Sequence, residues 1–146
     1  MRHVLVAALP LLFASVSAHA ATELNLSKDA ATDPQATALI VTGKGTGNIF
    51  LGRASATLQF ITDLSVPEAQ RQPVKLSALF RDKFPRVSPG QYLVQVGCFQ
   101  SGMVSFNQVF PVTIDAKPGK TYVVYCTGSR PVSRSAEVRE TDQTTQ

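Results

Sequence analysis

The sequence predicts an all-β protein, a small antiparallel β-sandwich of two sheets with about seven strands. The main support is a pattern that occurs twice, in residues 88–98 and 117–126: a Pro-Gly turn, a Tyr, and an apolar run that ends in Cys. Because residues two apart in a strand share a face, the Tyr, alternate valines and Cys of each copy point toward one core. Nine Gly and nine Pro are spread along the 146 residues, and no long stretch has helical periodicity, which suits strands joined by turns.

Residues 1–20 have the composition of a signal peptide. A short positive start, Met1-Arg2-His3, precedes an apolar run from Val4 to Val16, and Ala18 and Ala20 are small residues at the positions that a signal peptidase reads. The apolar run is too short to span a membrane comfortably. We therefore expect cleavage after Ala20 and a periplasmic or secreted protein without a membrane span.

Removal of residues 1–20 takes away both histidines, His3 and His19, and the chain contains no Trp. Without His, neither a Ser-His-Asp triad nor the usual His-containing zinc site can form. Loss of Arg2 reduces the 14 basic side chains to 13, against 10 acidic ones, which is far from the basic stripe of a nucleic-acid-binding protein. Composition therefore predicts no metal, no cofactor and no nucleic-acid partner, and it argues against an enzyme.

One domain is expected from a chain of this length, with a polar segment on either side of it. Residues 21–35 are polar and contain Pro34, so they are expected to form a flexible N-terminal arm. Residues 36–128 contain the predicted strands and make up the β-sandwich domain. The chain is polar after Gly128, and residues 129–146 are expected to form a disordered tail.

Alternation of apolar and polar residues predicts strands at residues 36–42, 53–61, 74–80, 92–99, 103–115 and 122–127. In the second of these, Ala54, Ala56, Leu58 and Phe60 are expected to share the inner face. Pro111 cannot donate a hydrogen bond to a neighbouring strand, so residues 103–115 are expected at a sheet edge or at a bulge.

The Gly-rich segment 43–47 allows two interpretations. A phosphate-binding loop needs a longer spacing and a helix behind it, whereas a short strand over residues 48–51 is expected to follow here, so a hairpin turn is favoured. Further along, a capping-box pattern from Ser65 to Glu68, with Pro73 soon after it, predicts a short helical turn near residues 66–71.

Cys98 and Cys126 are the two cysteines of the chain, and we expect them to form a disulfide. Export favours oxidation, and the count is even. A disulfide needs Cα atoms within about 7 Å, whereas two strands separated by a third strand stand about 9–10 Å apart. The bond therefore requires the two strands to face each other across the sheets or to be direct neighbours.

Residues 80–86 combine basic and aromatic side chains just before the first Pro-Gly turn. Arg81, Lys83, Phe84 and Arg86 are the candidate ligand contacts, because arginine pairs with carboxylate or phosphate and a Phe ring can stack on a sugar. The favoured alternative is a strand end with solvated charges and buried Phe side chains.

A second candidate surface is a sugar-stacking platform built from aromatic residues of the predicted strands. Residues of this kind in a sheet are more often core or cross-strand partners, which is the favoured interpretation. The residues concerned are Tyr92, Phe99, Phe106, Tyr122 and Tyr125.

The segment from Ser88 to Cys126, with two Pro-Gly turns that each lead into a Tyr-containing strand, resembles exported bacterial β-sandwich modules of the PEGA-like and carboxypeptidase-regulatory-like (transthyretin-type) families. The resemblance implies an immunoglobulin-like or transthyretin-like sandwich, with each turn leading into one of the last core strands. It also implies an accessory or interaction role. It carries no functional residue over to this chain.

Together these observations predict an exported, non-catalytic module that binds an envelope protein or an anionic glycan. Two alternatives stay open. A secreted inhibitor of an envelope hydrolase would present a rigid loop from the disulfide-bonded frame. A carboxylate-dependent hydrolase would need two paired carboxylates, whereas the spacing of Asp63, Glu68, Asp82 and Asp115 favours turn and capping roles.

Overall fold

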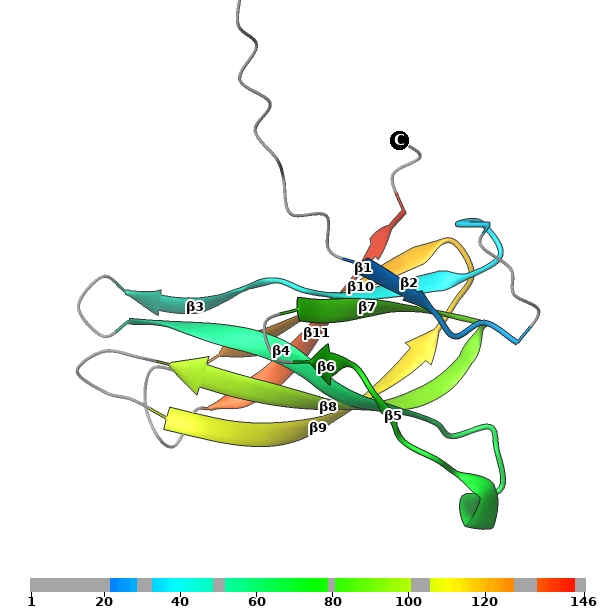
Figure 1. Ribbon diagram of the computed structural model, residues 1–146. Coiled ribbons are helices and arrows are strands. Elements are labelled where there is room, and N and C mark those ends of the chain that lie inside the picture. The colour runs from blue at the N-terminus through cyan, green and yellow to red at the C-terminus, as the bar shows by residue number, and fades with distance from the viewer. Residues whose placement is uncertain are drawn as a thin grey trace, which may run out of the picture.

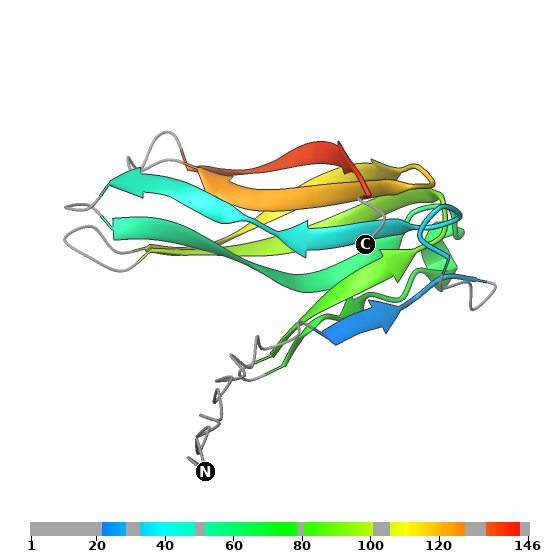
Figure 2. The same ribbon diagram turned by 90° about the horizontal axis from the view of Figure 1, so that it is seen from above.

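Two curled β-sheets pack face to face in the computed structural model, which describes residues 22–28, 33–48, 52–78, 81–100, 106–127 and 134–143 (Figure 1, Figure 2). The predicted all-β sandwich is confirmed. Within these ranges the chain forms eleven strands and one short 3-10 helix, against an expectation of about seven strands. No helix in this part of the chain is long and apolar enough to cross a membrane.

The first sheet has the strand order β1-β7-β2-β10-β11, with β6 beside β7. Its strands are β1 (Thr22–Asn25), β2 (Ala38–Thr42), β6 (Ser77–Ala78), β7 (Arg81–Val87), β10 (Lys120–Thr127) and β11 (Ser135–Asp142). The β1–β7 and β2–β10 pairs are parallel, whereas the β2–β7, β6–β7 and β10–β11 pairs are antiparallel, so this sheet is mixed and not purely antiparallel as expected. Alternation along a strand shows which face a residue takes, but it does not show which strand lies beside it.

The second sheet is antiparallel throughout its described strands and has the order β3-β4-β8-β9, with β5 beside β4. Its strands are β3 (Lys44–Asn48), β4 (Gly52–Asp63), β5 (Val74–Lys75), β8 (Gly90–Gln100) and β9 (Phe106–Ala116). β9 lies at the edge of this sheet, as Pro111 predicted.

The two strands of the repeated pattern supply the centre of the core. The expected inward residues of β8 and β10 are all buried, and these are Tyr92, Val94, Val96, Cys98, Tyr122, Val124 and Cys126. Each buried Tyr donates its hydroxyl to a backbone carbonyl near the turn before its strand: Tyr92 to Ser88 O at 3.0 Å and Tyr122 to Asp115 O at 2.8 Å. Burial, with a smaller contribution from the Asp63 charge, raises the pKa of Tyr92 to about 12.

A bulge in β4 changes the expected inner face of that strand. The pairing of β4 with β8 shifts register between Leu58 and Phe60. Ala54, Ala56 and Leu58 are buried as predicted, but beyond the bulge Ile61 is the buried residue, only 2% exposed. The extra residue of a bulge moves the following side chains to the opposite face, so the prediction for Phe60 is wrong.

The hairpin turn predicted at residues 43–47 is also wrong, because Lys44–Asn48 is strand β3. The chain passes from β2 in the first sheet to β3 in the second with only Gly43 between them. A Cβ on Gly45 would lie 2.2 Å from Ala54 O and 2.7 Å from Cys126 O. Glycine therefore lets β3 approach the backbone of both sheets at this crossing, which is a packing role and not a turn.

Both polar flanks contain strands where the sequence suggested an arm and a tail. β1, within the expected arm, pairs with β7 over four residues, and β11, within the expected tail, pairs with β10 over eight. Only Ala136 and Val138 of β11 pack against the core, and Arg134 lies over the Phe106 ring at 4.0 Å. An edge strand with so few apolar residues gives a weak sequence signal.

The expected helical turn near residues 66–71 is present as a 3-10 helix over Glu68–Gln70. Its N-cap is Pro67, without a side-chain capping bond, so the capping-box prediction is wrong. The Ser65 hydroxyl bonds to the Asp63 carboxylate instead. Burial raises the pKa of Asp63, but the bonds from Ser65 and Lys28 outweigh it, and the pKa lies below its usual value.

Substitutions of Gly43 and Gly45, the two glycines where the chain crosses from β2 to β3, should lower the free energy of unfolding by different amounts. Gly45→Ala should destabilise the fold by more than about 3 kcal/mol, because backbone atoms block the new methyl. A Cβ on Gly43 would meet only the Val123 side chain, at 2.7 Å, so Gly43→Ala should cost about 1–3 kcal/mol. Urea denaturation measures both free energies of unfolding.

A double-mutant cycle provides the control for that comparison. Gly43→Ala should cost less in a Val123→Ala background than in the wild type, because the clashing methyl is then absent. Val123→Ala should give no relief to Gly45→Ala. Equal costs at the two glycines would contradict this account of the crossing.

Candidate ligand-binding site

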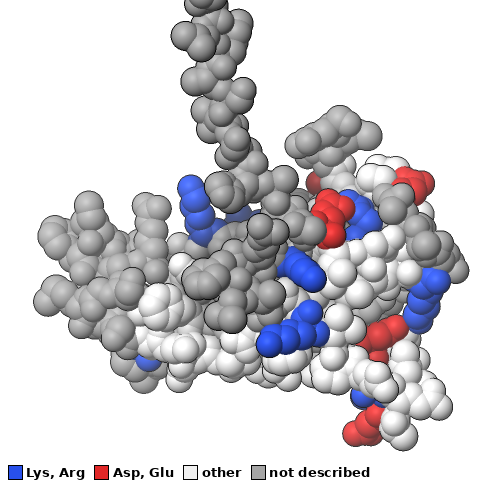
Figure 3. Space-filling model, viewed as in Figure 1, with Lys and Arg blue, Asp and Glu red and all other residues white. Residues whose placement is uncertain are grey.

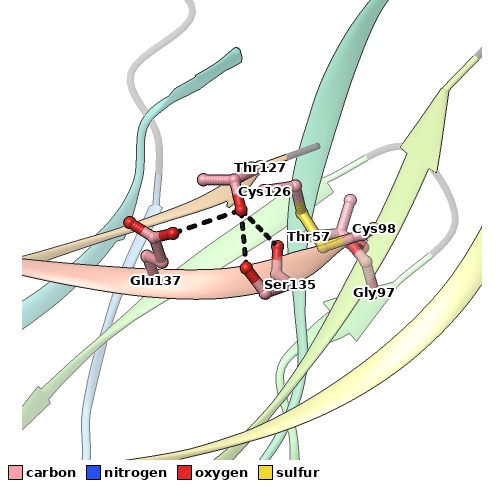
Figure 4. The surroundings of a disulfide bond; sticks show 7 residues. All are labelled: Thr57, Gly97, Cys98, Cys126, Thr127, Ser135 and Glu137. Carbon is pink, nitrogen blue, oxygen red and sulfur yellow. Dashed lines mark hydrogen bonds between the residues drawn. A yellow bond between two sulfur atoms is a disulfide. The ribbon is translucent and has the colours of Figure 1, made fainter. Parts of the chain in front are cut away.

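Cys98 and Cys126 form the predicted disulfide, with their Cα atoms 5.7 Å apart. The bond joins β8 of the second sheet to β10 of the first, so it crosses the sandwich, which was one of the two arrangements expected (Figure 4). Both cysteines are fully buried. The disulfide therefore belongs to the frame and holds β10 at a fixed place against the opposite sheet.

The predicted contact residue Arg86 is part of the scaffold. Its side chain is only 9% exposed, and its Nε and Nη2 donate to the two Glu23 carboxylate oxygens at 3.1 and 3.2 Å. Its Nη1 donates to Thr37 Oγ1 and Gln143 Oε1, both at 3.1 Å. One guanidinium thus ties together β1, the residue before β2 and the residue after β11, so these internal bonds occupy Arg86 and do not support the prediction that it contacts a ligand.

Of the other predicted contacts, the structure describes the side chains of Lys83 and Phe84. Phe84 is half-buried and packs against the hydrophobic core, as the alternative interpretation had it. Lys83 is half-exposed, and Arg81 begins β7 with its side chain outside the described part of the structure. The segment is a strand in its own right, and the described Lys and Arg side chains of the face in Figure 3 are spread out with Asp and Glu among them.

A groove on the outer face of the first sheet, called here the Tyr125 groove, has a volume of about 340 Å³. Its walls come from the β2–β3 crossing, β10 and β11, and the lining residues are Gly43, Lys44, Val123, Tyr125, Arg139 and Thr141. The strand pairing places Val123 opposite Arg139, and Tyr125 opposite Glu137. The groove therefore combines an aromatic ring, two cationic side chains and a hydroxyl.

Gly43 forms part of the groove wall beside Val123 and Tyr125. Its N–H donates to Val124 O at 2.8 Å, which continues the parallel β2–β10 ladder by one residue. A Cβ on Gly43 would lie 2.7 Å from Val123 Cγ1 and 3.8 Å from the Tyr125 Cβ. Glycine therefore lets the Val123 side chain pack closely over the backbone at this point.

The electrostatics of the groove favour an anion. The Arg139 guanidinium lies over the Tyr125 ring, 5.7 Å from its centroid. Within the described residues neither Arg139 nor Lys44 makes an ion pair, whereas Lys117 and Lys120 are paired with Glu140 and Asp142. Two cations that line one groove without a partner supply a field that an anionic group can satisfy.

Polar contacts on the adjoining strands fix the Tyr125 side chain. Its hydroxyl donates to Glu137 Oε2 at 3.0 Å, and the other carboxylate oxygen, Oε1, accepts from Thr127 Oγ1 at 3.3 Å. Thr127 also bonds to the Ser135 hydroxyl at 2.6 Å, directly beside the disulfide (Figure 4). Tyr125 precedes Cys126 in β10, so the ring stands on a strand that is covalently fixed to the opposite sheet.

The five aromatic residues considered as a platform do not lie together. Tyr92, Phe106 and Tyr122 are buried, as favoured. Phe99 is 50% exposed and belongs to the second sheet, and only Tyr125 lines the groove. The cationic partners were missed because Arg139 lies in the expected tail and Lys44 in the expected turn. A period-two alternation over Ala136, Val138 and Glu140 was too short a signal to reveal β11.

Comparisons with protein-family models, with curated proteins and with solved structures find no match to this chain. In the described ranges, no group of three or more His, Cys, Asp and Glu side chains is placed to hold a metal ion.

Removal of the disulfide should lower the free energy of unfolding by about 3–4 kcal/mol, because it closes a loop with a sequence separation of 28 residues. The double variant Cys98→Ala/Cys126→Ala and the reduced wild type should lose similar amounts in urea denaturation. If denatured, non-reduced protein reacts with two equivalents of a thiol reagent, the bond is absent in solution.

Matched substitutions in β7 should show that Arg86 stabilises the fold whereas Lys83 does not. Arg86→Gln should destabilise the protein by about 1–3 kcal/mol, because the Glu23 carboxylate, Thr37 and Gln143 lose a shared charged donor. Lys83→Gln should change stability by less than about 0.5 kcal/mol. Thermal and urea denaturation measure both, and equally small effects would mean that Arg86 is solvated.

Proposed function

We propose that this protein is an exported, non-catalytic module of the cell envelope that binds an anionic ligand in the Tyr125 groove. The observation that carries the proposal is that Arg139 and Lys44, neither of which has an ion-pair partner among the described residues, lie beside an aromatic ring in one hollow. Export follows from the composition of residues 1–20 and is consistent with the disulfide.

The structure of the groove favours ligand binding over catalysis. Its aromatic ring and Arg139 stand on paired strands next to a disulfide, so they are held in place before a ligand arrives. The groove also places Glu137 two residues from Arg139 on β11, which limits the charge density that a ligand can carry. An accessory or interaction role of the kind seen in PEGA-like and transthyretin-type modules agrees with such a site.

Two charge-matched variants test the proposal and separate the Tyr125 groove from the β7 surface. Lys44→Gln/Arg139→Gln should weaken binding to acidic envelope polysaccharide at least tenfold, which is about 1.4 kcal/mol. Arg81→Gln/Lys83→Gln removes the same charge elsewhere and should leave affinity within about twofold of the wild type. Isothermal titration in low and physiological salt measures both, and wild-type binding should weaken as salt rises.

If Arg81→Gln/Lys83→Gln lost more affinity than Lys44→Gln/Arg139→Gln, the ligand would contact β7 and not the Tyr125 groove. Equal losses in both would mean that net charge alone drives adsorption, and the proposed site would then be abandoned. Thermal denaturation of each variant shows that the fold is retained.

A further inference from the structure

We infer that the ligand of the Tyr125 groove is a carboxylated sugar of the uronic-acid type, with its ring on Tyr125 and its carboxylate on Arg139 and Lys44. The inference rests on the proposed function, since it names the chemistry of the ligand for the same groove. Four features of the groove lead to it.

The first feature is a fixed apolar surface for a ring. The Tyr125 hydroxyl is already committed to Glu137 at 3.0 Å, and the Arg139 guanidinium lies over the ring, 5.7 Å from its centroid. The rest of the ring surface is the part of this side chain left for a ligand, and Gly43 adds no side chain of its own to the groove. A sugar ring with an apolar face fits this position better than an extended peptide side chain does.

The second feature is the type of cation. Arg139 presents a planar fork of donors that matches the two oxygens of a carboxylate, and Lys44 adds a point charge from the β2–β3 crossing. The strand pairing sets Arg139 opposite Val123, two residues before Tyr125 on the same face of β10, and its guanidinium lies 5.7 Å from the centroid of the Tyr125 ring. One small ligand can therefore reach both, and a sugar whose carboxylate is attached to the ring carries both groups.

The third feature is the neighbouring acceptor. Glu137 stands opposite Tyr125 on β11 and shares its oxygens with the hydroxyls of Tyr125 and Thr127. A carboxylate at this position repels a densely charged polyanion but accepts hydrogen bonds from sugar hydroxyls. The ligand that satisfies both sides of the groove therefore has separated negative charges with hydroxyl groups between them.

The fourth feature is size. A groove of about 340 Å³ is at the lower end of the range of about 300–1,000 Å³ for small-molecule sites. Such a volume suits a short segment of a sugar chain.

The test is isothermal titration of the full mature chain with an oligogalacturonate, its methyl ester, inorganic polyphosphate and poly-glutamate. The oligogalacturonate should bind at least tenfold more tightly than its ester, which keeps the rings but removes the charges. It should also bind more tightly than polyphosphate or poly-glutamate, which keep charge but lack the ring. Arg139→Lys, which keeps the charge but loses the fork, should bind the oligogalacturonate several-fold more weakly.

Matched aromatic variants complete the test. Tyr125→Leu should lose about fivefold to tenfold in affinity for the oligogalacturonate, while Phe99→Leu, at the exposed aromatic of the other sheet, should lose none. No binding of the oligogalacturonate, or equal binding of polyphosphate with no effect of Tyr125→Leu, would overturn the inference. In the latter case the proposed anion site still stands if Lys44→Gln/Arg139→Gln weakens binding at least tenfold and Arg81→Gln/Lys83→Gln does not, and it falls if the Lys44→Gln/Arg139→Gln variant binds every probe like the wild type.

Discussion

The bond between Cys98 and Cys126 is the constraint on which most of this structure depends. It fixes β10 against β8 across the core, and at the same end Gly45 brings β3 against the carbonyl of Cys126. The two sheets and the strand that passes between them therefore meet at one place. The groove lies on the outer face of that region, so its ring and its cations have a rigid support beneath them.

A second set of interactions holds the other end of β10. Gln143 donates to the carbonyls of Lys120 and Thr37 and accepts from Arg86, which in turn binds Glu23. The disulfide and this polar network therefore secure opposite ends of the same strand. Glu23 and Gln143 come from the two polar flanks of the sequence, so this network draws both flanks into the fold.

The repeated turn pattern and the cysteines revealed the central strands and the disulfide because those residues are strongly apolar and their alternation is regular. Strands β1, β3, β7 and β11 were not predicted, for physical reasons that differ. β3 contains Gly where the backbone needs room, β7 contains charges that face its neighbours, and β11 is a polar edge with two inward apolar residues. Arg139 lies on β11 and Lys44 on β3, two of the strands that were not predicted. The sequence therefore drew attention to Tyr125 but did not show that Arg139 and Lys44 lie beside it.

The position of β11 as the last strand of the first sheet determines when the groove residues are synthesised. β11 follows every other described strand in the sequence, and chains leave the ribosome N-terminal end first. Both cysteines and the strands that carry them precede it, so Arg139 and Thr141 are the last residues of the groove to be synthesised. A chain cut short before residue 135 would keep both cysteines but would lack these two groove residues and Gln143, which holds the other end of β10.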